Sequence, residues 1–373
     1  MLYLDNSATT QILPEVKEAM LPFLLEEFGN PSSKYYTLSA NAKSAVEEAR
    51  KYISSLLGCA TDEVIFTSGA TESNNMIIKG VADLHGNENN HLVTSKVEHP
   101  SVIETFKYLE TRGFKVTYLD VDQYGRVDIT DLEKIIATTP PLLVSIMWGN
   151  NELGSLNDIK NISDLCANKE IFFHTDATQV IGKVKANLDE LKGIRLLSCS
   201  AHKFHGPKGI GVSIIRKDSL GLKTKITPLL HGGGQEQDYR SGTLPVHNIV
   251  GMGKAAQLAL NNLESNIDKL QELETTLTNI LKSKFGNVIS FNNDQSNKIP
   301  GILSVRFNGI NNEILVKNLA PYVSLSTGSA CSSAKPSHVL QAAGLSLDEV
   351  RETVRFSLSP LVKCSDLHIF NHL

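Results

Sequence analysis

Cysteine is scarce in this sequence: there are five in 373 residues, an odd number, and they lie far apart. A secreted disulfide framework usually shows an even number of closely spaced cysteines, so this distribution argues for a reducing compartment. We therefore expect a cytoplasmic protein. The five are Cys59, Cys166, Cys199, Cys331 and Cys364.

The sequence also lacks a large excess of charge and any long apolar run. A net charge of −4 gives no reason to expect direct binding to nucleic acid or to a membrane surface. No stretch approaches the ~18 apolar residues of a membrane-spanning helix. The first residues, MLYLDNSATT, show no basic segment followed by an apolar one. We expect a soluble protein without a targeting segment.

The length and the order of patterns indicate two domains. Between about residues 60 and 216, short β-rich runs such as VIFTS, HLVTS and IFFHTD alternate with helical patterns. This alternation predicts an α/β fold with a mostly parallel sheet between helices. A long helical stretch runs from Asn248 to about Phe285, and shorter strand and helix patterns follow it. We expect a large domain over residues 14–250 and a small one over residues 251–373 together with residues 1–13.

Residues directly after the strands are the first candidates for a ligand site, because ligands bind at the carboxyl ends of parallel strands. In TSGATESNN, small residues at Gly69, Ala70 and Thr71 separate a predicted strand from a helix. Backbone N–H groups at such a helix start can bind a phosphate. A glycine at this kind of turn is, however, more often only a turn.

Two further segments carry unusual side chains after strands. In HTDATQ, Asp176 ends an apolar run and Gln179 follows it; such a carboxylate can hold a proton on a heterocyclic nitrogen, although a helix cap is the commoner use. In SCSAHKFHGPKG, Lys203 follows a strand and can form a Schiff base if burial lowers its pKa. A solvated loop lysine is the alternative. A zinc site of Cys199, His202 and His205 is a poorer interpretation, because no complementary ligand pair follows, and we expect no metal.

A phosphate cradle, an aspartate for a ring nitrogen and a Schiff-base lysine together indicate pyridoxal 5'-phosphate. At this point the sequence resembles the cysteine desulfurases, which are class V aminotransferase-like enzymes of pyridoxal phosphate fold type I. The likeness spans nearly the whole chain, and this fold implies a seven-stranded sheet in the large domain. The matching segments are YLDNSATT, NPSS, FTSGATESNN, EHPSV, NNELG, HTDATQ, SAHKFHGPKG, HGGGQE, RSGTLPV, GSACSS and VRFSL.

The resemblance implies a role for each matching residue around the cofactor. Lys203 would bind it covalently, Asp176 would pair with the pyridine nitrogen, and Gln179 would bond the phenolic oxygen. His99 would stack on the ring and help to move protons. Arg355 would bind the substrate carboxylate, since a planar guanidinium suits it. The remaining roles are phosphate binding for Ala70, Thr71, Ser200 and His202, cofactor or substrate contact for Asn151, and phosphate contact in the neighbouring subunit of a homodimer for Thr243.

The same resemblance gives Cys331 a function. Its thiolate would take the sulfur of L-cysteine, leaving L-alanine and an enzyme persulfide that passes to a sulfur-acceptor protein. The small residues of STGSACSS suit a thiol that must reach two places. Cys59, Cys166 and Cys199 are expected to be packing residues, and Cys364 is left undecided. The acceptor pathway is open between iron–sulfur clusters, tRNA thiolation and DNA sulfur modification.

Some positions depart from the family pattern, and two other functions stay open. Tyr36 and Ser39 stand where the family often has histidine and glycine. Arg195 stands where the family often has aspartate, and Gln237 and Asp238 stand where arginine and glycine are common. The alternatives are another fold type I enzyme, such as a selenocysteine or cystine lyase or an aminotransferase, and a sulfur-relay scaffold without turnover. Both fit less well, because Cys331 and the cofactor set occur together.

Overall fold

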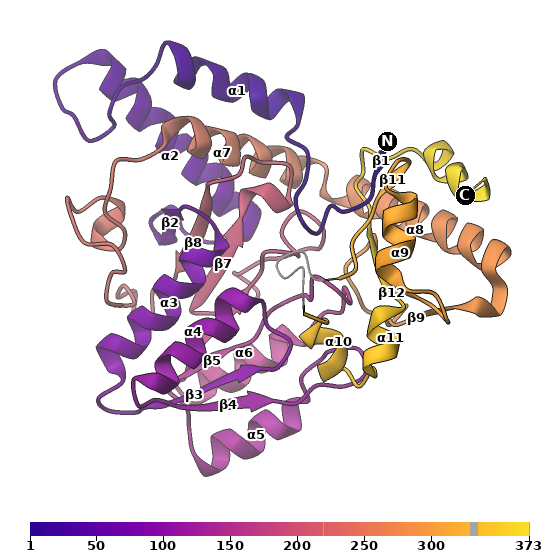
Figure 1. The fold of residues 1–373 in the computed structure, drawn as a ribbon. Helices are drawn as coiled ribbons and strands as arrows, with labels where there is room; N and C mark the ends of the chain where they lie inside the picture. Colours follow the sequence, from indigo (N-terminus) through magenta and orange to yellow (C-terminus); the bar gives the residue numbers. More distant parts are fainter. Residues whose placement is uncertain (219, 329–334, 373) are drawn as a thin grey trace.

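A seven-stranded sheet forms the centre of the larger part of the molecule (Figure 1). The computed structural model describes residues 1–218, 220–328 and 335–372. The strand order is β2-β8-β7-β6-β5-β3-β4; β8 is antiparallel to both neighbours, and the strands from β7 to β4 are parallel. This confirms the predicted α/β class. The strands are β2 (Val64–Thr67), β3 (His91–Ser95), β4 (Lys115–Leu119), β5 (Leu143–Ser145), β6 (Phe172–Asp176), β7 (Leu196–Ser200) and β8 (Gly211–Ile215).

Helices cover both faces of this sheet, which is why β7 near its middle, and even β2 at its edge, are buried along their whole length. One face packs against α3 (Ala70–His85) and α4 (Pro100–Thr111), through residues such as Ile77 and Phe106. The other face packs against a larger set of helices. These are α1 (Pro14–Leu25), α2 (Thr37–Leu57), α5 (Ile129–Thr138), α6 (Ile159–Asn168) and α7 (Val246–Asn261).

A second core holds the smaller part together. It lies around an antiparallel sheet of order β12-β10-β9 and a parallel pair of β1 with β11. Leu4, directly after β1, is buried in this core, so the N-terminal segment packs with the C-terminal part of the chain. The elements are β1 (Leu2–Tyr3), α8 (Leu263–Phe285), β9 (Ile289–Phe291), β10 (Ile302–Phe307), α9 (Asn312–Leu319), β11 (Val323–Ser324) and β12 (Thr353–Ser357).

The long helical stretch after residue 248 forms two helices, α7 and α8, with a break at Asn262. The backbone of Asn262 leaves the helical region, at φ −113° and ψ 11°. The buried face of α7 belongs to the core of the large sheet, through residues such as Ile249 and Ala256, whereas α8 packs in the second core. The domain boundary at residue 250 stays a prediction, and this packing favours a boundary close to Asn262.

Two short helices close to the C-terminus return to the large sheet. Val339 of α10 (His338–Ala342) and Val350 of α11 (Leu347–Arg351) share a small core with Met147 and Leu153. This contact brings His338 to the carboxyl ends of the central strands. Short 3-10 helices complete the described fold: η1 (Thr61–Glu63), η2 (Ala201–Lys203), η3 (Glu236–Asp238), η4 (Gly286–Val288) and η5 (Cys364–Asn371).

None of the helices in the described ranges is long and apolar enough to cross a membrane.

Candidate active site

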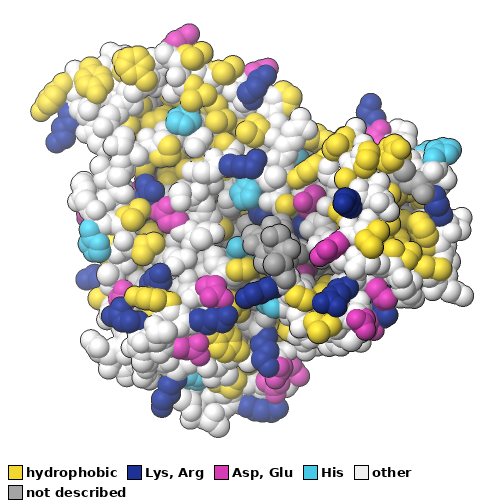
Figure 2. Space-filling view, in the orientation of Figure 1, with side chains coloured by type: hydrophobic (Ala, Val, Ile, Leu, Met, Phe, Trp, Pro, Cys, Tyr) yellow, Lys and Arg dark blue, Asp and Glu magenta, His cyan; other side chains and the backbone are white. Residues whose placement is uncertain are grey.

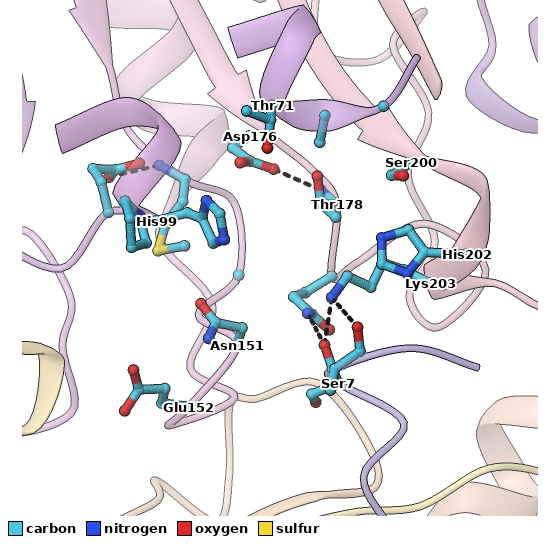
Figure 3. A pocket seen from close by; sticks show the side chains of 18 of the residues that line it. Ser7, Thr71, His99, Asn151, Glu152, Asp176, Thr178, Ser200, His202 and Lys203 are labelled. Carbon is cyan, nitrogen blue, oxygen red and sulfur yellow. Dashed lines mark hydrogen bonds between the residues drawn. The ribbon is translucent and has the colours of Figure 1, made fainter. Parts of the chain in front are cut away.

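A cavity of about 400 Å³ lies where β6 and β7 end (Figure 3). Side chains of the large sheet line it together with the N-terminal segment and with residues of the small part. The structure therefore brings ten of the residues named from the sequence to one place. They are Ala70, Thr71, His99, Asn151, Asp176, Gln179, Ser200, His202, Lys203 and Arg355.

The turn between β2 and α3 forms one wall of the cavity. Gly69 is the N-cap of α3 with φ 151°, a conformation that favours glycine. A Cβ atom at Gly211 would lie 2.6 Å from the Cα of Gly69, so the close approach of β8 to this turn requires glycine there. The first N–H groups of α3, at Ala70 and Thr71, have no partner within their own helix because of their position. They and the helix dipole suit a phosphate group.

Asp176 is the last residue of β6 and is buried, with an exposed fraction of 5%. Its Oδ1 accepts a hydrogen bond from the backbone N–H of Thr178 at 3.0 Å, and its Oδ2 accepts one from Nδ2 of Asn74 at 2.8 Å. Donors therefore hold both carboxyl oxygens in place. A carboxylate in this position can retain a proton on a heterocyclic nitrogen.

Lys203 in η2 points to the N-terminal segment. Its Nζ donates to the backbone oxygens of Ser7 at 2.6 Å and of Ala8 at 2.8 Å, and Nε2 of Gln179 also donates to the oxygen of Ser7, at 2.9 Å (Figure 3). Behind Gln179, Lys183 donates to its Oε1 at 3.1 Å. Burial, together with the nearby charges of Lys203 and Arg355, lowers the pKa of Lys183 to about 7.

Two histidines lie on either side of the cavity, and both are held neutral. His99 is the N-cap of α4, and its Nδ1 accepts from the backbone N–H of Ser101 at 3.1 Å. Burial lowers the pKa of His99, and the charge of Lys203 acts in the same direction. Nδ1 of His202 lies 3.1 Å from Oγ1 of Thr9. Burial and the neighbouring lysines lower the pKa of His202 to about 4.

Arg355 of β12 reaches the cavity from the small part and is 1% exposed. Its Nη2 bonds Oδ1 of Asp5 at 2.7 Å, and its Nη1 donates to the backbone oxygens of Asn151 and Gly328. Its Nε is buried and has no partner among the residues that the structure describes. An unpaired N–H of a buried guanidinium beside a cavity suits an anionic oxygen of a ligand.

The structure adds cavity residues to which the sequence analysis gave no role. Ser7 and Ala8 come from a matching segment, NSATT, but only the fold shows that their carbonyl groups meet Lys203. Glu98 is fully buried, and burial raises its pKa to about 8. Glu152 accepts from the hydroxyl of Ser337 at 2.5 Å. Glu98 and Glu152 lie in the matching segments EHPSV and NNELG, but their place in the cavity depends on contacts between distant segments.

Two of the expected site residues are not placed in this cavity. Thr243 is exposed and is not among the lining residues, and its contact with a neighbouring subunit stays a prediction. Cys331 lies outside the described residues. In the part of the chain that the structure covers, no group of histidine, cysteine, aspartate and glutamate could hold a metal ion.

The departures from the family pattern lie away from the cavity. The guanidinium of Arg195 bonds Oγ1 of Thr224 and lies over the ring of Phe172. Gln237 and Asp238 have φ of 58° and 70°. Asp238 thus takes the left-handed conformation that glycine would adopt freely, and aspartate is one of the residues that tolerate it.

The arrangement fits pyridoxal 5'-phosphate on the chemistry of its donors. The start of α3 offers N–H groups to a phosphate, Asp176 offers an acceptor to a ring nitrogen, and Lys203 offers an amine to an aldehyde. Oγ of Ser7 and Oγ1 of Thr178, at the edge of the same cavity, are buried and have no partner within the described chain. Polar groups without partners at a cavity are consistent with a polar ligand.

Comparisons with known proteins agree with this geometry. Residues 2–370 match the family described as "Aminotransferase class-V". A protein named "Cysteine desulfurase IscS" from Dictyoglomus turgidum is 44% identical over 98% of this chain and 92% of its own length. A solved structure titled "NIFS-LIKE PROTEIN" superposes with a TM-score of 0.91 at 36% identity, over 99% of this chain and 96% of the other. Another, titled "SspA in complex with cysteine", has a TM-score of 0.84 at 36% identity, over 96% and 99%.

The chain therefore belongs to the class V aminotransferase family, whose members depend on pyridoxal 5'-phosphate. Its relatives place it among the cysteine desulfurases of that family, as the sequence predicted. The prediction of an enzyme with this cofactor is confirmed in the same way.

Proposed function

We propose that this protein transfers the sulfur of L-cysteine to its own Cys331. The reaction forms an S–S bond and breaks the Cβ–S bond of the substrate, and it converts L-cysteine and the Cys331 thiol into L-alanine and a Cys331 persulfide without an external oxidant or reductant. The observation that carries the proposal is the single cavity in which Lys203, Asp176, His99 and Arg355 meet. The solved relative that is titled as a complex with cysteine supports the choice of substrate.

Each cavity residue has a task that its contacts support. When bound, pyridoxal 5'-phosphate withdraws electrons from the Cα atom of an amino acid. The first turn of α3, Ser200 and His202 would hold the phosphate, and Asp176 would keep a proton on the ring nitrogen. Gln179 would bond the phenolic oxygen. Lys203 would hold the cofactor and then move the proton at Cα, because its amine lies inside the cavity.

The substrate needs two further residues. Arg355 would bind its carboxylate through the buried Nε and Nη groups, with Asn151 beside it. Cys331 would attack the substrate sulfur as a thiolate, since the thiolate is the nucleophilic form of cysteine. Cys199 and Cys166 are buried, and burial holds the pKa of both thiols well above the usual range. They are therefore poor alternatives to Cys331.

A homodimer with shared sites is part of the proposal. Thr243 is exposed on the loop before α7, where it can reach a neighbouring subunit. Large apolar side chains are exposed at the end of α1 and in the segment after it, at the upper left of Figure 2. Such a patch favours contact with another copy of the chain. The exposed residues are Leu21, Leu24, Leu25, Phe28, Tyr35 and Tyr36.

The persulfide would then pass to an acceptor protein in the cytoplasm. The odd and scattered cysteines of the sequence support a reducing compartment. The acceptor pathway is best found by capture of the acceptor itself, through a mixed disulfide with the persulfide-loaded protein.

The experiment that tests the proposed function follows the sulfur. The wild-type protein incubated with L-cysteine should release alanine and gain one labile sulfur on the peptide that contains Cys331. Cys331→Ser should lose the persulfide and turnover but keep the bound cofactor, because a hydroxyl forms no persulfide. Cys364→Ser is the matched control and should behave as wild type. Wild-type rates of alanine and persulfide formation in Cys331→Ser would contradict the proposal and direct attention to Cys364 or to a lyase.

A further inference from the structure

Asn74 occupies a position between two groups of the site. It lies in α3, is fully buried and does not line the cavity. Its Nδ2 donates to Oδ2 of Asp176 at 2.8 Å and to Oγ of Ser101 at 2.9 Å. The amide cannot be reversed at low cost, because reversal would turn its oxygen toward the Asp176 carboxylate. One amide nitrogen thus contacts both β6 and α4.

The hydrogen bonds continue from Ser101 to His99. Oγ of Ser101 lies 2.8 Å from Nδ1 of His99, and the backbone N–H of Ser101 donates to the same Nδ1 at 3.1 Å. A backbone N–H can only donate, so Nδ1 is an acceptor and the neutral ring carries its proton on Nε2. Because Oγ of Ser101 already accepts from Asn74, its own proton is free to be donated to Nδ1.

We propose that Asn74 is a positioning residue that couples Asp176 to His99. Its one amide group stabilises the Asp176 carboxylate and directs the Ser101 hydroxyl proton to Nδ1 of His99. The inference rests on the proposed function only for the roles of Asp176 and His99 in binding the cofactor. The hydrogen-bond chain itself belongs to the protein with or without a ligand.

A consequence for His99 follows from this geometry. The neutral ring can gain a proton only at Nδ1, and protonation there would displace the backbone N–H of Ser101 and would force the Ser101 hydroxyl to stop donating to Nδ1. His99 is therefore a neutral Nε2–H donor and a weak base. The proton at the substrate Cα is then left to Lys203.

The surroundings of His99, like its bonds from Ser101, lower the pKa of the imidazole. Burial lowers its pKa most, Lys203 and His338 lower it further, and the charge of Asp176 opposes them. The buried carboxyl of Glu98 precedes it in the chain, and burial keeps the pKa of Glu98 high. Removal of the Ser101 hydroxyl takes away one of the two donors that must be displaced when Nδ1 of His99 gains a proton. The midpoint of His99 titration should therefore rise.

The test measures the titration of His99 by NMR in full-length protein with ring-labelled histidine, both with bound pyridoxal phosphate and after its removal. The His99 signal is assigned by its loss in His99→Gln. Ser101→Ala should raise the midpoint by about half to one pH unit, as expected for one hydrogen bond of ordinary strength. Ser101→Thr retains the hydroxyl and should restore the wild-type value.

Asn74→Leu tests the coupling, with Asn75→Ala as the matched control. Asn75 is the next residue, and within the described chain its amide bonds the backbone oxygen of Thr71 in its own helix. Asn74→Leu should raise the titration midpoint of His99, because it removes the donor that directs the Ser101 hydroxyl to Nδ1 of His99. The double variant should shift His99 by less than the sum of the two single shifts, because both act through one chain of bonds.

The coupling is refuted if the single shifts add fully, or if Ser101→Ala and Asn74→Leu leave His99 as Asn75→Ala does. If Asn74→Leu does not fold, Ser101→Ala and Ser101→Thr still test the hydrogen bonds to His99, and Asn74→Ser replaces Asn74→Leu in the test of the coupling. Failure of the proposed function would show separately, as a wild-type protein that makes no alanine while its His99 titration behaves as described.

Discussion

The backbone oxygen of Ser7 lies 2.6 Å from Nζ of Lys203, although the two residues are 196 positions apart. Ser7 follows β1, which pairs with β11 of the small part, whereas Lys203 follows β7 of the large sheet. Nε2 of Gln179 donates to the same oxygen at 2.9 Å. The floor of the cavity thus exists only when both parts of the chain are folded and docked.

Lys203→Ala should abolish covalent binding of pyridoxal phosphate and reduce turnover to background. The amine of Lys203 is the one that the N-terminal carbonyl groups hold inside the cavity. Borohydride reduction of the wild-type protein, followed by peptide mapping, should find the pyridoxyl group on Lys203. Lys208→Ala is the matched control, since Lys208 also borders the cavity. A pyridoxyl group on any other lysine would disprove the assignment.

Arg355→Lys should raise the KM for L-cysteine by about 10- to 100-fold, because a lysine cannot reproduce the fork of a guanidinium and a charged hydrogen bond contributes about 1.5–3 kcal/mol. The kcat should fall less than kcat/KM. Arg306→Lys is the control: Arg306 lies on the neighbouring strand and pairs with Glu349 and Glu352 outside the cavity. Steady-state kinetics decides, and an unchanged KM in Arg355→Lys would exclude carboxylate binding.

Lys183→Met should change the pH dependence of stability in the cofactor-free protein. The pKa of Lys183 is lowered from 10.5 to about 7 by burial, so between these values the unfolded chain binds a proton that the folded chain does not. Wild-type stability should therefore rise with pH from about 7 to about 10 more steeply than that of Lys183→Met.

Urea unfolding at pH 7 and pH 9.5 checks this prediction. The free energy of unfolding should differ most between wild type and variant at pH 7, because the buried amine destabilises the folded wild type most at that pH. The difference should amount to a few kcal/mol. Lys185→Met, two positions away and exposed, should leave the slope unchanged. If the free energy of unfolding depended on pH in the same way in Lys183→Met and in wild type, Lys183 would be charged in the folded protein.

Glu236→Gln should lower the free energy of unfolding by about 3–5 kcal/mol, because it removes the buried counter-ion of the buried Arg50. Arg50 and Glu236 form two hydrogen bonds, at 3.0 and 2.8 Å, and Oε2 of Glu236 also accepts from the N–H of Phe66. Glu47→Gln removes the other, half-exposed partner of Arg50 and should cost less than about 1 kcal/mol. Equal urea midpoints for the two variants would contradict the argument.

Much of this protein could be predicted from local patterns. The alternation of VIFTS, HLVTS and IFFHTD with helical segments identified the sheet, because strands buried on both faces are continuous apolar runs. The positions after these runs identified Asp176 and Lys203, because ligands bind at the carboxyl ends of strands. The resemblance to the desulfurases then added His99 and Arg355, whose role no pattern within one strand indicates.

The rest depends on contacts between distant segments. Asn262 ends α7 inside a stretch of good helix formers, because the chain must there pass from one core to the other. Ser7 and Ala8 meet Lys203 only after β1 has paired with β11. The chain from Asn74 through Ser101 to His99 joins two helices and a strand, so sequence spacing carries no sign of it.

The final prediction concerns the shared site, and it uses two inactive proteins. Thr243 is exposed and about forty residues beyond Lys203, outside the cavity of its own chain. If it completes the phosphate site of a neighbouring subunit, each dimer has two composite sites. A heterodimer of Lys203→Ala with Thr243→Ala then has one site with both defects and one site that is intact. Mixed dimers, purified through two different tags, should recover up to half of the wild-type activity per dimer. A heterodimer of Lys203→Ala with wild type is the control for subunit exchange. Heterodimers as inactive as their parents would place Thr243 in the site of its own subunit.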